Sequence, residues 1–409
     1  MKNRLSMGNT YVFVMYFLYA TLVFFLPLIF VGNTSEAYEF PKTFLVYAFG
    51  ILLFGSFLIR RIIRTKKIVV PSAYVLAFVG MYILSTVFSM HRYTSLWGYY
   101  GRFNGGLLSV TAFFLLYFAA INIFSKEVFG SLINFSILSF VFVSIFGISQ
   151  YISGVGRVYS TIGQPNWLAQ FLVMILPLVL YRYFKSAKPI PLFFIYSLGF
   201  FCLWLTFSMS GIAALLASLV ILMWIIKSTL TKTRVMLIIA VMVIVIFFFP
   251  GMFKQKADDI YYDLERFFGS LFVVNAETLG YKISDPGYIR EGLWTGTIKL
   301  IFSSPKVFLI GSGPATFPYA FQEYRPKVLN HSSEWDFVFN KPHNYYLELW
   351  SEIGLLGFLS YLFLVASLLK RLPKQAVPSV VAFLVTNLFG WPVTSTVLLF
   401  WGFIAYARL

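Results

Sequence analysis

The stretch NKPHNYYLELWSEIGLLG, residues 340–357, marks the point where a long polar segment meets an apolar one. Asn340 and Pro342 are typical of a helix start, so the pattern predicts a helix that holds His343 in its first turn and then enters a membrane. A neutral imidazole can accept a proton near pH 7. Free N–H groups at a helix N-terminus also favour bound anions such as phosphates. His343 is therefore our first candidate for a catalytic base, against the alternative of an interfacial histidine that only caps the helix.

The two carboxylates that follow His343 are predicted to have structural roles. At 100° per residue, Glu348 and Glu352 lie about 140° and 180° around such a helix from the histidine, so we do not expect them as its partners. A carboxylate just inside a membrane tends to face the protein interior, and we interpret Glu352 as an acceptor of interhelix hydrogen bonds. Gly354 and Gly357 would allow another helix to approach closely.

The composition indicates an integral membrane protein. The chain is 59% hydrophobic and 11% charged, with a mean hydropathy of +0.80, whereas soluble domains have about 25% charged residues. Long unbroken apolar runs indicate helices rather than the alternating strands of a β-barrel. The single cysteine, Cys202, excludes an intramolecular disulfide. The predicted fold class is an all-α polytopic bundle of about twelve transmembrane helices.

Twelve apolar runs are each near the roughly 20 residues needed to cross a bilayer. They are 11–31, 43–63, 69–90, 105–124, 130–152, 165–184, 190–207, 210–227, 233–250, 345–369, 375–390 and 392–407. The first is longer than the apolar core of a signal peptide, so we expect a retained helix. The predicted organisation is helices 1–9 in 1–250, one large loop in 251–344 and helices 10–12 in 345–409, forming a single membrane domain.

The charge distribution predicts the topology. Segments on the side of the N-terminus hold 18 of the 32 Lys and Arg residues and one acidic residue, whereas the other side holds 14 basic and 14 acidic residues. The positive-inside rule then predicts cytoplasmic N- and C-termini and an external loop at 251–344. The basic residues are interpreted as topology signals and contacts to anionic lipids, so we expect no nucleic-acid partner.

The large loop and its neighbours supply the other candidate residues. Loops of this size are usually functional. Within it, 288–302 is predicted to form an amphipathic helix along the membrane surface, with its apolar residues at helical spacing. Guanidinium groups suit phosphates, so external arginines could bind a diphosphate at headgroup level, although a single arginine is more often structural. The apolar residues are Ile289, Leu293, Trp294, Ile298 and Ile301, and the arginines are Arg102, Arg157, Arg290 and Arg325.

Missing motifs exclude several chemistries. The sequence has no GxxxxGK[ST] stretch of a P-loop ATPase and no His/Cys cluster with zinc spacing. The pair Asp258–Asp259 is interpreted as a solvated turn rather than a metal site. The longest predicted cytoplasmic loop has about ten residues, too few for a nucleotide-sugar enzyme domain. We expect an activated substrate delivered by the membrane to the outer side, with no cofactor and no metal.

Several stretches together resemble the O-antigen ligase and O-antigen polymerase superfamily of bacterial membrane glycosyltransferases. They are GRFNG at 101–105, Arg157 with GQPNWLA at 163–169, TFSMSG at 206–211, Arg290 and Trp294 before Ser304–Pro305, GSGP at 311–314, and His343, Asn344, Leu347, Glu352, Gly354 and Gly357. The resemblance implies a GT-C-like helical bundle in the bacterial cytoplasmic membrane. It also implies inverting transfer of a glycan from undecaprenyl diphosphate to an acceptor hydroxyl outside that membrane, without ATP or metal.

The resemblance further implies roles for individual residues. His343 would deprotonate the acceptor, and Arg290, with Arg157, would hold the diphosphate and stabilise the leaving group. The other candidates for substrate binding are Arg102, Arg325, Asn166 and Asn344. One departure is Met209, which stands where the family often has an arginine, so another arginine would have to supply that charge.

Several alternatives remain open at this stage. A lipid A-core acceptor would make the protein a ligase in lipopolysaccharide assembly, which the family name favours. A growing glycan would make it a polymerase, and a protein Ser or Tyr would make it an O-oligosaccharyltransferase. A transporter or flippase of lipid-linked sugars ranks lower, because the spans are nearly free of charged residues. A non-catalytic assembly partner stays open because of Met209.

Overall fold

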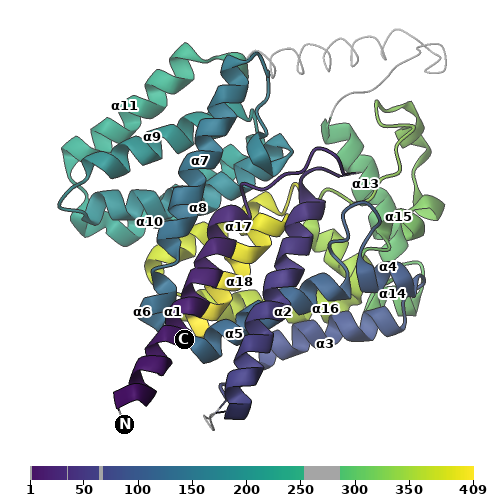
Figure 1. The fold of residues 1–409 in the computed structure, drawn as a ribbon. Coiled ribbons are helices and arrows are strands. Elements are labelled where there is room, and N and C mark those ends of the chain that lie inside the picture. Colours follow the sequence, from purple (N-terminus) through teal and green to yellow (C-terminus); the bar gives the residue numbers. More distant parts are fainter. Residues whose placement is uncertain (1, 35, 64–67, 253–285) are drawn as a thin grey trace.

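The computed structural model describes residues 2–34, 36–63, 68–252 and 286–409 (Figure 1), so Asp258–Asp259 lies outside the described residues. All regular elements in these ranges are helices, as the sequence predicts. The α-helices are α1 (Lys2–Phe25), α2 (Glu39–Ile63), α3 (Ala73–Val87), α4 (Arg92–Trp97), α5 (Leu107–Ile123), α6 (Lys126–Gly130), α7 (Ile133–Ile152), α8 (Pro165–Lys185), α9 (Ile190–Leu205), α10 (Met209–Ile226), α11 (Lys232–Phe248), α13 (Pro286–Ile301), α14 (Pro305–Ile310), α15 (Phe317–Ala320), α16 (Tyr345–Arg371), α17 (Val377–Thr386) and α18 (Thr394–Arg408). The 3₁₀ helices are η1 (Ser160–Ile162), η2 (Lys227–Thr229), η4 (Phe321–Tyr324), η5 (Lys327–His331) and η6 (Lys374–Ala376).

Each of the twelve apolar runs overlaps one of the longer α-helices. Within the described ranges, five helices are long and apolar enough to cross a membrane on their own: Glu39–Ile62, Lys126–Ile152, Pro165–Lys185, Met209–Thr229 and Tyr345–Arg371. Others, such as Leu107–Ile123, are apolar but shorter. The structure therefore agrees with a helical membrane protein, and the count of twelve spans stays a prediction.

Two apolar cores meet at the C-terminal helices. The first core joins α1, α2, α3 and α5 to α16, α17 and α18, and the second gathers α7 to α11 around α8. In Figure 1, α17 and α18 lie in the centre, between these two groups. The side chain of Gln170 in α8 donates to Thr386 (3.0 Å) and to Asn387 (2.8 Å) and accepts from Thr396 (2.7 Å). This buried polar anchor fixes the connection between α17 and α18 against α8.

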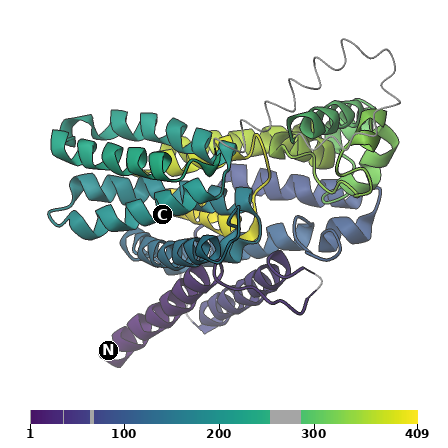
Figure 2. The ribbon, with the colours of Figure 1, turned by 90° about the horizontal axis from the view of Figure 1, so that it is seen from above.

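The predicted amphipathic helix is present as α13, but its apolar face is covered by protein. Ile289, Leu293 and Leu300 are buried in a small core with residues of α15, η4 and η5, and α13 also contacts α16. Ile298, which the sequence assigns to the apolar face, is instead 47% exposed. The buried face of α13 is narrower than the predicted apolar face, because only the residues against this core and against α16 are covered. Figure 1 shows α13, α14 and α15 on the side of the molecule opposite α9 to α11. Figure 2 shows the same separation from above.

The helix that follows His343 begins later than the sequence predicts. Its N-cap is Asn344, whose side-chain oxygen accepts from the N–H groups of Tyr346 (3.0 Å) and Leu347 (3.1 Å). The prediction of Asn340 as the cap was wrong, because His343 has a left-handed backbone (φ 55°) that cannot belong to a first helical turn. The histidine therefore precedes the helix and does not share its faces.

The N-terminal N–H groups of α16 are also not free, which corrects the expected anion site. Tyr345 N–H donates to the Asn387 carbonyl (2.9 Å), and Asn344 takes the next two. The helix bends at Gly354 (φ 72°), where a Cβ would lie 2.3 Å from the backbone N of Ile310 in α14. The expected close approach of another helix is confirmed at this glycine.

Candidate functional site

His343 lines a small pocket between the start of α16 and the connection from α17 to α18. Its ring meets the Trp391 ring edge-on, with centroids 5.0 Å apart and planes at 86°. The other walls come from the start of α8, from α10 and from α17: Gln164, Asn166, Trp167, Gln170, Ser210, Thr386, Phe389 and Gly390. The His343 ring is partly exposed, and the described part of the chain offers it no hydrogen bond. Its nitrogens are therefore available to a substrate.

His343 and Arg290 share one electrostatic environment. Burial, together with the positive charge of Arg290 on α13, lowers the pKa of His343 to about 4. Arg290 also lies near Glu334, where burial raises the carboxyl pKa and the arginine opposes that rise. The imidazole is therefore neutral at pH 7 and able to accept a proton. The structure brings together the two residues that the sequence selects as catalytic.

Two further arginines lie near this pocket. Arg102 stacks over the Trp167 ring at 5.0 Å, and Trp167 lines the pocket. Arg157 donates from Nε to the Thr206 carbonyl (3.2 Å), at the turn from α9 to α10. This turn leads directly into Ser210, which also lines the pocket.

Arg325 is placed differently from the other candidate arginines. Its Nη2 donates to the Trp335 carbonyl (2.7 Å), and its guanidinium lies 5.0 Å above the Phe339 ring. It is absent from the residues that line the His343 pocket. These contacts join residues of the segment between α13 and α16 to one another, which is a structural use of the arginine.

The two candidate asparagines have defined partners. Asn166 Oδ1 accepts from the Ser208 hydroxyl (2.8 Å), and Asn166 lines the pocket. Asn344 caps α16 and so orients the backbone next to His343. Met209 is the first residue of α10 and is 53% exposed, immediately before the pocket residue Ser210.

Lys341, two residues before His343, is part of a buried charge cluster that the sequence analysis did not predict. Its ammonium group pairs with Glu348 Oε1 and lies 4.0 Å from Glu352 Oε1, and all three side chains are nearly buried. Burial lowers the pKa of Lys341, but the two carboxylates outweigh that effect and raise it. The sequence did contain one indication of it, because two carboxylates inside a predicted membrane helix require a cation nearby.

The partners of both glutamates agree with the structural role predicted for them. Glu352 accepts from the backbone N–H groups of Ala315 (2.8 Å) and Phe317 (3.4 Å), so its hydrogen bonds reach the loop before α15 rather than another membrane helix. No hydrogen bond or ion pair among the described residues joins either glutamate to His343. The described ranges also contain no group of three His, Cys, Asp or Glu that could hold a metal ion.

One family model matches the chain over residues 192–362, and its description is O-antigen ligase. The matched span runs from α9 into α16 and includes Arg290 and His343. The chain has no significant match among curated proteins. The family match supports the superfamily resemblance seen in the sequence, and members of that family are glycosyltransferase-like enzymes.

Proposed function

We propose that this chain, a member of the O-antigen ligase superfamily, transfers a glycan from undecaprenyl diphosphate to an acceptor hydroxyl at the outer face of the bacterial cytoplasmic membrane. The observation behind the proposal is the position of the His343 ring, which lines a pocket and has no hydrogen bond from the described residues. Burial and the nearby Arg290 lower its pKa, which favours the neutral imidazole at pH 7. A base beside a cation is the pair that this transfer requires. The positive-inside rule supports an external position for this pocket, with both termini in the cytoplasm.

In the proposed reaction the acceptor oxygen attacks the anomeric carbon of the donor sugar. Its proton passes to a ring nitrogen of His343 as the new C–O bond forms. The bond from the anomeric carbon to the diphosphate oxygen breaks on the opposite side, so the centre inverts, and the electron pair leaves with the diphosphate. Arg290 stabilises this leaving group, which is an electrostatic contribution that needs no metal or ATP.

The same two residues couple donor binding to the strength of the base. In the free protein, burial and the Arg290 charge both oppose protonation of His343. A diphosphate bound at Arg290 would offset the cation and add negative charge beside the imidazole, so it would raise the pKa of His343. His343 therefore becomes a stronger base when the donor is bound. Without the donor, the low pKa keeps the imidazole unprotonated.

Arg102 and Arg157 are the proposed additional cations for the diphosphate. Arg157 reaches the Thr206 carbonyl, three residues before Met209, where the family often has an arginine. Arg102 lies on Trp167, a wall of the His343 pocket. Arg102 thus contacts a residue of the pocket, and Arg157 contacts the turn that leads to Ser210, whereas Arg325 is held elsewhere.

The acceptor proposed first is a lipid A-core hydroxyl, which makes the protein a ligase. Polymerase and protein O-oligosaccharyltransferase activities use the same base and donor and differ only in the acceptor. They are separated by supplying lipid A-core, a repeat-unit glycan or a peptide as the only acceptor in otherwise equal reactions. Transfer to the glycan or peptide alone would replace the ligase assignment.

The test of the mechanism is transfer from undecaprenyl diphosphate in proteoliposomes by His343→Ala and Arg290→Ala variants. Loss of a general base typically costs about 10²–10⁴-fold in rate, and loss of an electrostatic stabiliser about 10²–10³-fold. His91→Ala is a matched control, because His91 only caps α4 and stacks on Tyr319. Lys299→Ala is the control on α13, because Lys299 is exposed. Full transfer by both site variants at equal protein levels would refute the mechanism.

A chelator provides the second arm of the same assay. We expect transfer to continue in its presence, because the proposed steps use only His343 and arginine. Activity that disappears with the chelator and returns with a divalent cation would contradict this proposal.

A further inference from the structure

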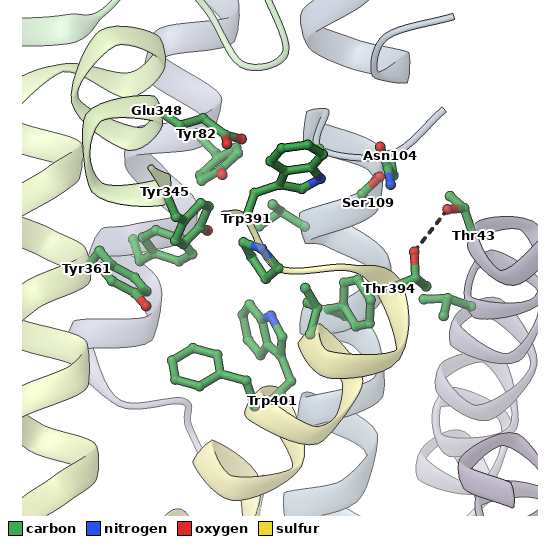
Figure 3. A pocket seen from close by; sticks show the side chains of 18 of the residues that line it. Thr43, Tyr82, Asn104, Ser109, Tyr345, Glu348, Tyr361, Trp391, Thr394 and Trp401 are labelled. Atoms are coloured by element: carbon green, nitrogen blue, oxygen red, sulfur yellow. Dashed lines mark hydrogen bonds between the residues drawn. The ribbon is translucent and has the colours of Figure 1, made fainter. Parts of the chain in front are cut away.

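A second cavity lies next to the His343 pocket and shares Trp391 with it (Figure 3). Figure 3 shows Glu348, Tyr82, Asn104 and Ser109 toward one end and Trp401 toward the other. Lys341 belongs to the polar lining. The apolar lining is aromatic for the most part, with Phe78, Phe113, Phe383 and Phe400 beside Trp401. The cavity is therefore an aromatic chamber with a few polar groups, as small-molecule sites commonly are.

One buried polar atom of this chamber lacks a partner in the described part of the chain. Glu348 is 6% exposed, and its Oε1 pairs with Lys341, but no donor among the described residues reaches its Oε2. Tyr361 is 1% exposed, and its hydroxyl lies at the Asn387 side chain. Buried polar atoms are nearly always paired, so the carboxylate oxygen of Glu348 indicates a missing donor in this cavity.

The charges around the chamber indicate an uncharged occupant. Lys341 and Arg102 provide two positive charges, since Arg102 is close enough to act on the pKa of Lys341. Glu348 and Glu352 provide two negative charges, and both lie against Lys341. The buried Glu39 accepts from the lining residues Asn104 and Thr394 and adds a third negative charge, which the neighbouring Lys42 balances. The formal charges therefore cancel, and a phosphate or an ammonium group would enter without a counter-charge. A hydroxyl can donate to Glu348 Oε2 and accept from Tyr361 at no such cost.

We propose that this chamber binds an uncharged sugar ring, as the unit of the acceptor glycan adjacent to the one that presents the attacking hydroxyl. The aromatic side chains would cover its C–H faces, and Glu348 and Tyr361 would bind its hydroxyls. Trp391 lines both spaces, so a ring in the chamber lies beside the reacting unit rather than against His343. This assignment of the chamber to the acceptor rests on the proposed function, whereas sugar binding itself does not.

The experiment measures binding without turnover, by protection of a thiol. Ser109 is 5% exposed and lines the chamber, so a Ser109→Cys variant in a Cys202→Ala background places one thiol inside it. The protein in lipid nanodiscs is treated with methyl methanethiosulfonate, with and without methyl glycosides of glucose, galactose and N-acetylglucosamine. We expect at least one glycoside to slow modification in a saturable manner.

The matched control is a Ser136→Cys variant in the same background. Ser136 is 4% exposed and lines a different cavity, between α1, α7 and α18, so its thiol should be modified at the same rate with or without glycosides. Equal rates at both thiols for every glycoside would overturn the proposal. Slowing by inorganic phosphate but by no glycoside would also overturn it, because the occupant would then be an anion.

A Tyr361→Phe exchange in the Ser109→Cys protein separates binding from folding. It removes one hydroxyl and keeps the ring, so the protein should still fold, and the glycoside concentration for half-protection should rise about tenfold, the effect of one lost hydrogen bond. An unchanged concentration would remove Tyr361 from the site and refute this geometry. Protection that persists in a His343→Ala protein inactive in transfer would retain the sugar site, so the two proposals can fail separately.

Discussion

The buried cluster of Lys341, Glu348 and Glu352 allows a prediction about both stability and catalysis. A Lys341→Met variant keeps the length of the side chain and removes its charge. Glu352 retains the backbone donors of the loop before α15, whereas Glu348 Oε1 loses its partner and its Oε2 already has none in the described residues. Most of the loss should therefore fall on Glu348.

The magnitude follows from the burial of the three side chains, which are 11%, 7% and 5% exposed for Lys341, Glu348 and Glu352. Removing one partner of a buried pair costs about 3–5 kcal/mol, because the other charge stays buried without compensation. Replacing both partners by uncharged groups of similar shape is often nearly neutral. We therefore expect Lys341→Met to lower the free energy of unfolding by about 3 kcal/mol and the double variant with Glu348→Gln to recover most of this.

The measurement is a double-mutant cycle of unfolding in lipid nanodiscs, with single variants at Lys341 and Glu348 and their combination. The transfer rate is measured on the same samples. Because His343 is two residues from Lys341, kcat should fall in the single variant even where the protein remains folded, with a smaller change in the KM for the donor. A Lys341→Arg variant retains the charge and should recover part of the activity.

A stability change below about 1 kcal/mol for Lys341→Met would refute this reasoning, since surface ion pairs contribute that little. An interaction energy near zero in the cycle would refute it as well. If stability falls but kcat is unaffected, the cluster stabilises the fold without positioning His343.

Three further outcomes are expected. Gly354→Ala should lower stability by several kcal/mol in nanodisc unfolding, because φ is 72° and the new Cβ would lie 2.3 Å from the Ile310 nitrogen; a neutral change would contradict the bend. Met209→Arg should lower the KM for the donor, since it restores a cation beside Ser210, and an unchanged KM would show that the existing arginines suffice. As the pH decreases, kcat/KM should fall only near pH 4, where His343 becomes protonated in the free protein. The fall of kcat should occur at higher pH, because the donor is then bound. A fall of kcat at equal or lower pH would exclude the coupling to Arg290.

The sequence predicted the helices well, because a helix in a membrane requires a continuous apolar run, which is a local feature of the sequence. We can recognise long apolar runs, and the charges between them, without knowing which helices are in contact. The start of α16 was predicted less well, because Asn340 and Asn344 are both good capping residues by type. The choice between them depends on the Asn387 carbonyl, which takes the Tyr345 N–H from a distant part of the chain.

The sequence selects only some of the residues that surround His343, and the roles proposed for them stay predictions. His343 and Arg290 were chosen by residue type and resemblance, and the structure places them in one electrostatic environment. Trp391 was not predicted, although it contacts the His343 ring, because a tryptophan near the end of a membrane chain has no distinctive spacing. Lys341 was counted only as a loop charge, since its two carboxylate partners appear only when α16 is folded beside it.

The spacing of the segment 341–348 has a meaning that its pattern alone did not reveal. His343 has a left-handed backbone, a conformation that costs a non-glycine residue about 1–3 kcal/mol and persists only where its surroundings hold it. Those surroundings are the Lys341–Glu348 pair on one side and the Asn344 cap on the other. The first buried carboxylate of α16 thus reaches back over the histidine to the lysine before it. Glu348, five residues after the histidine, is thus not its acid–base partner but holds the loop that presents the proposed base to its pocket.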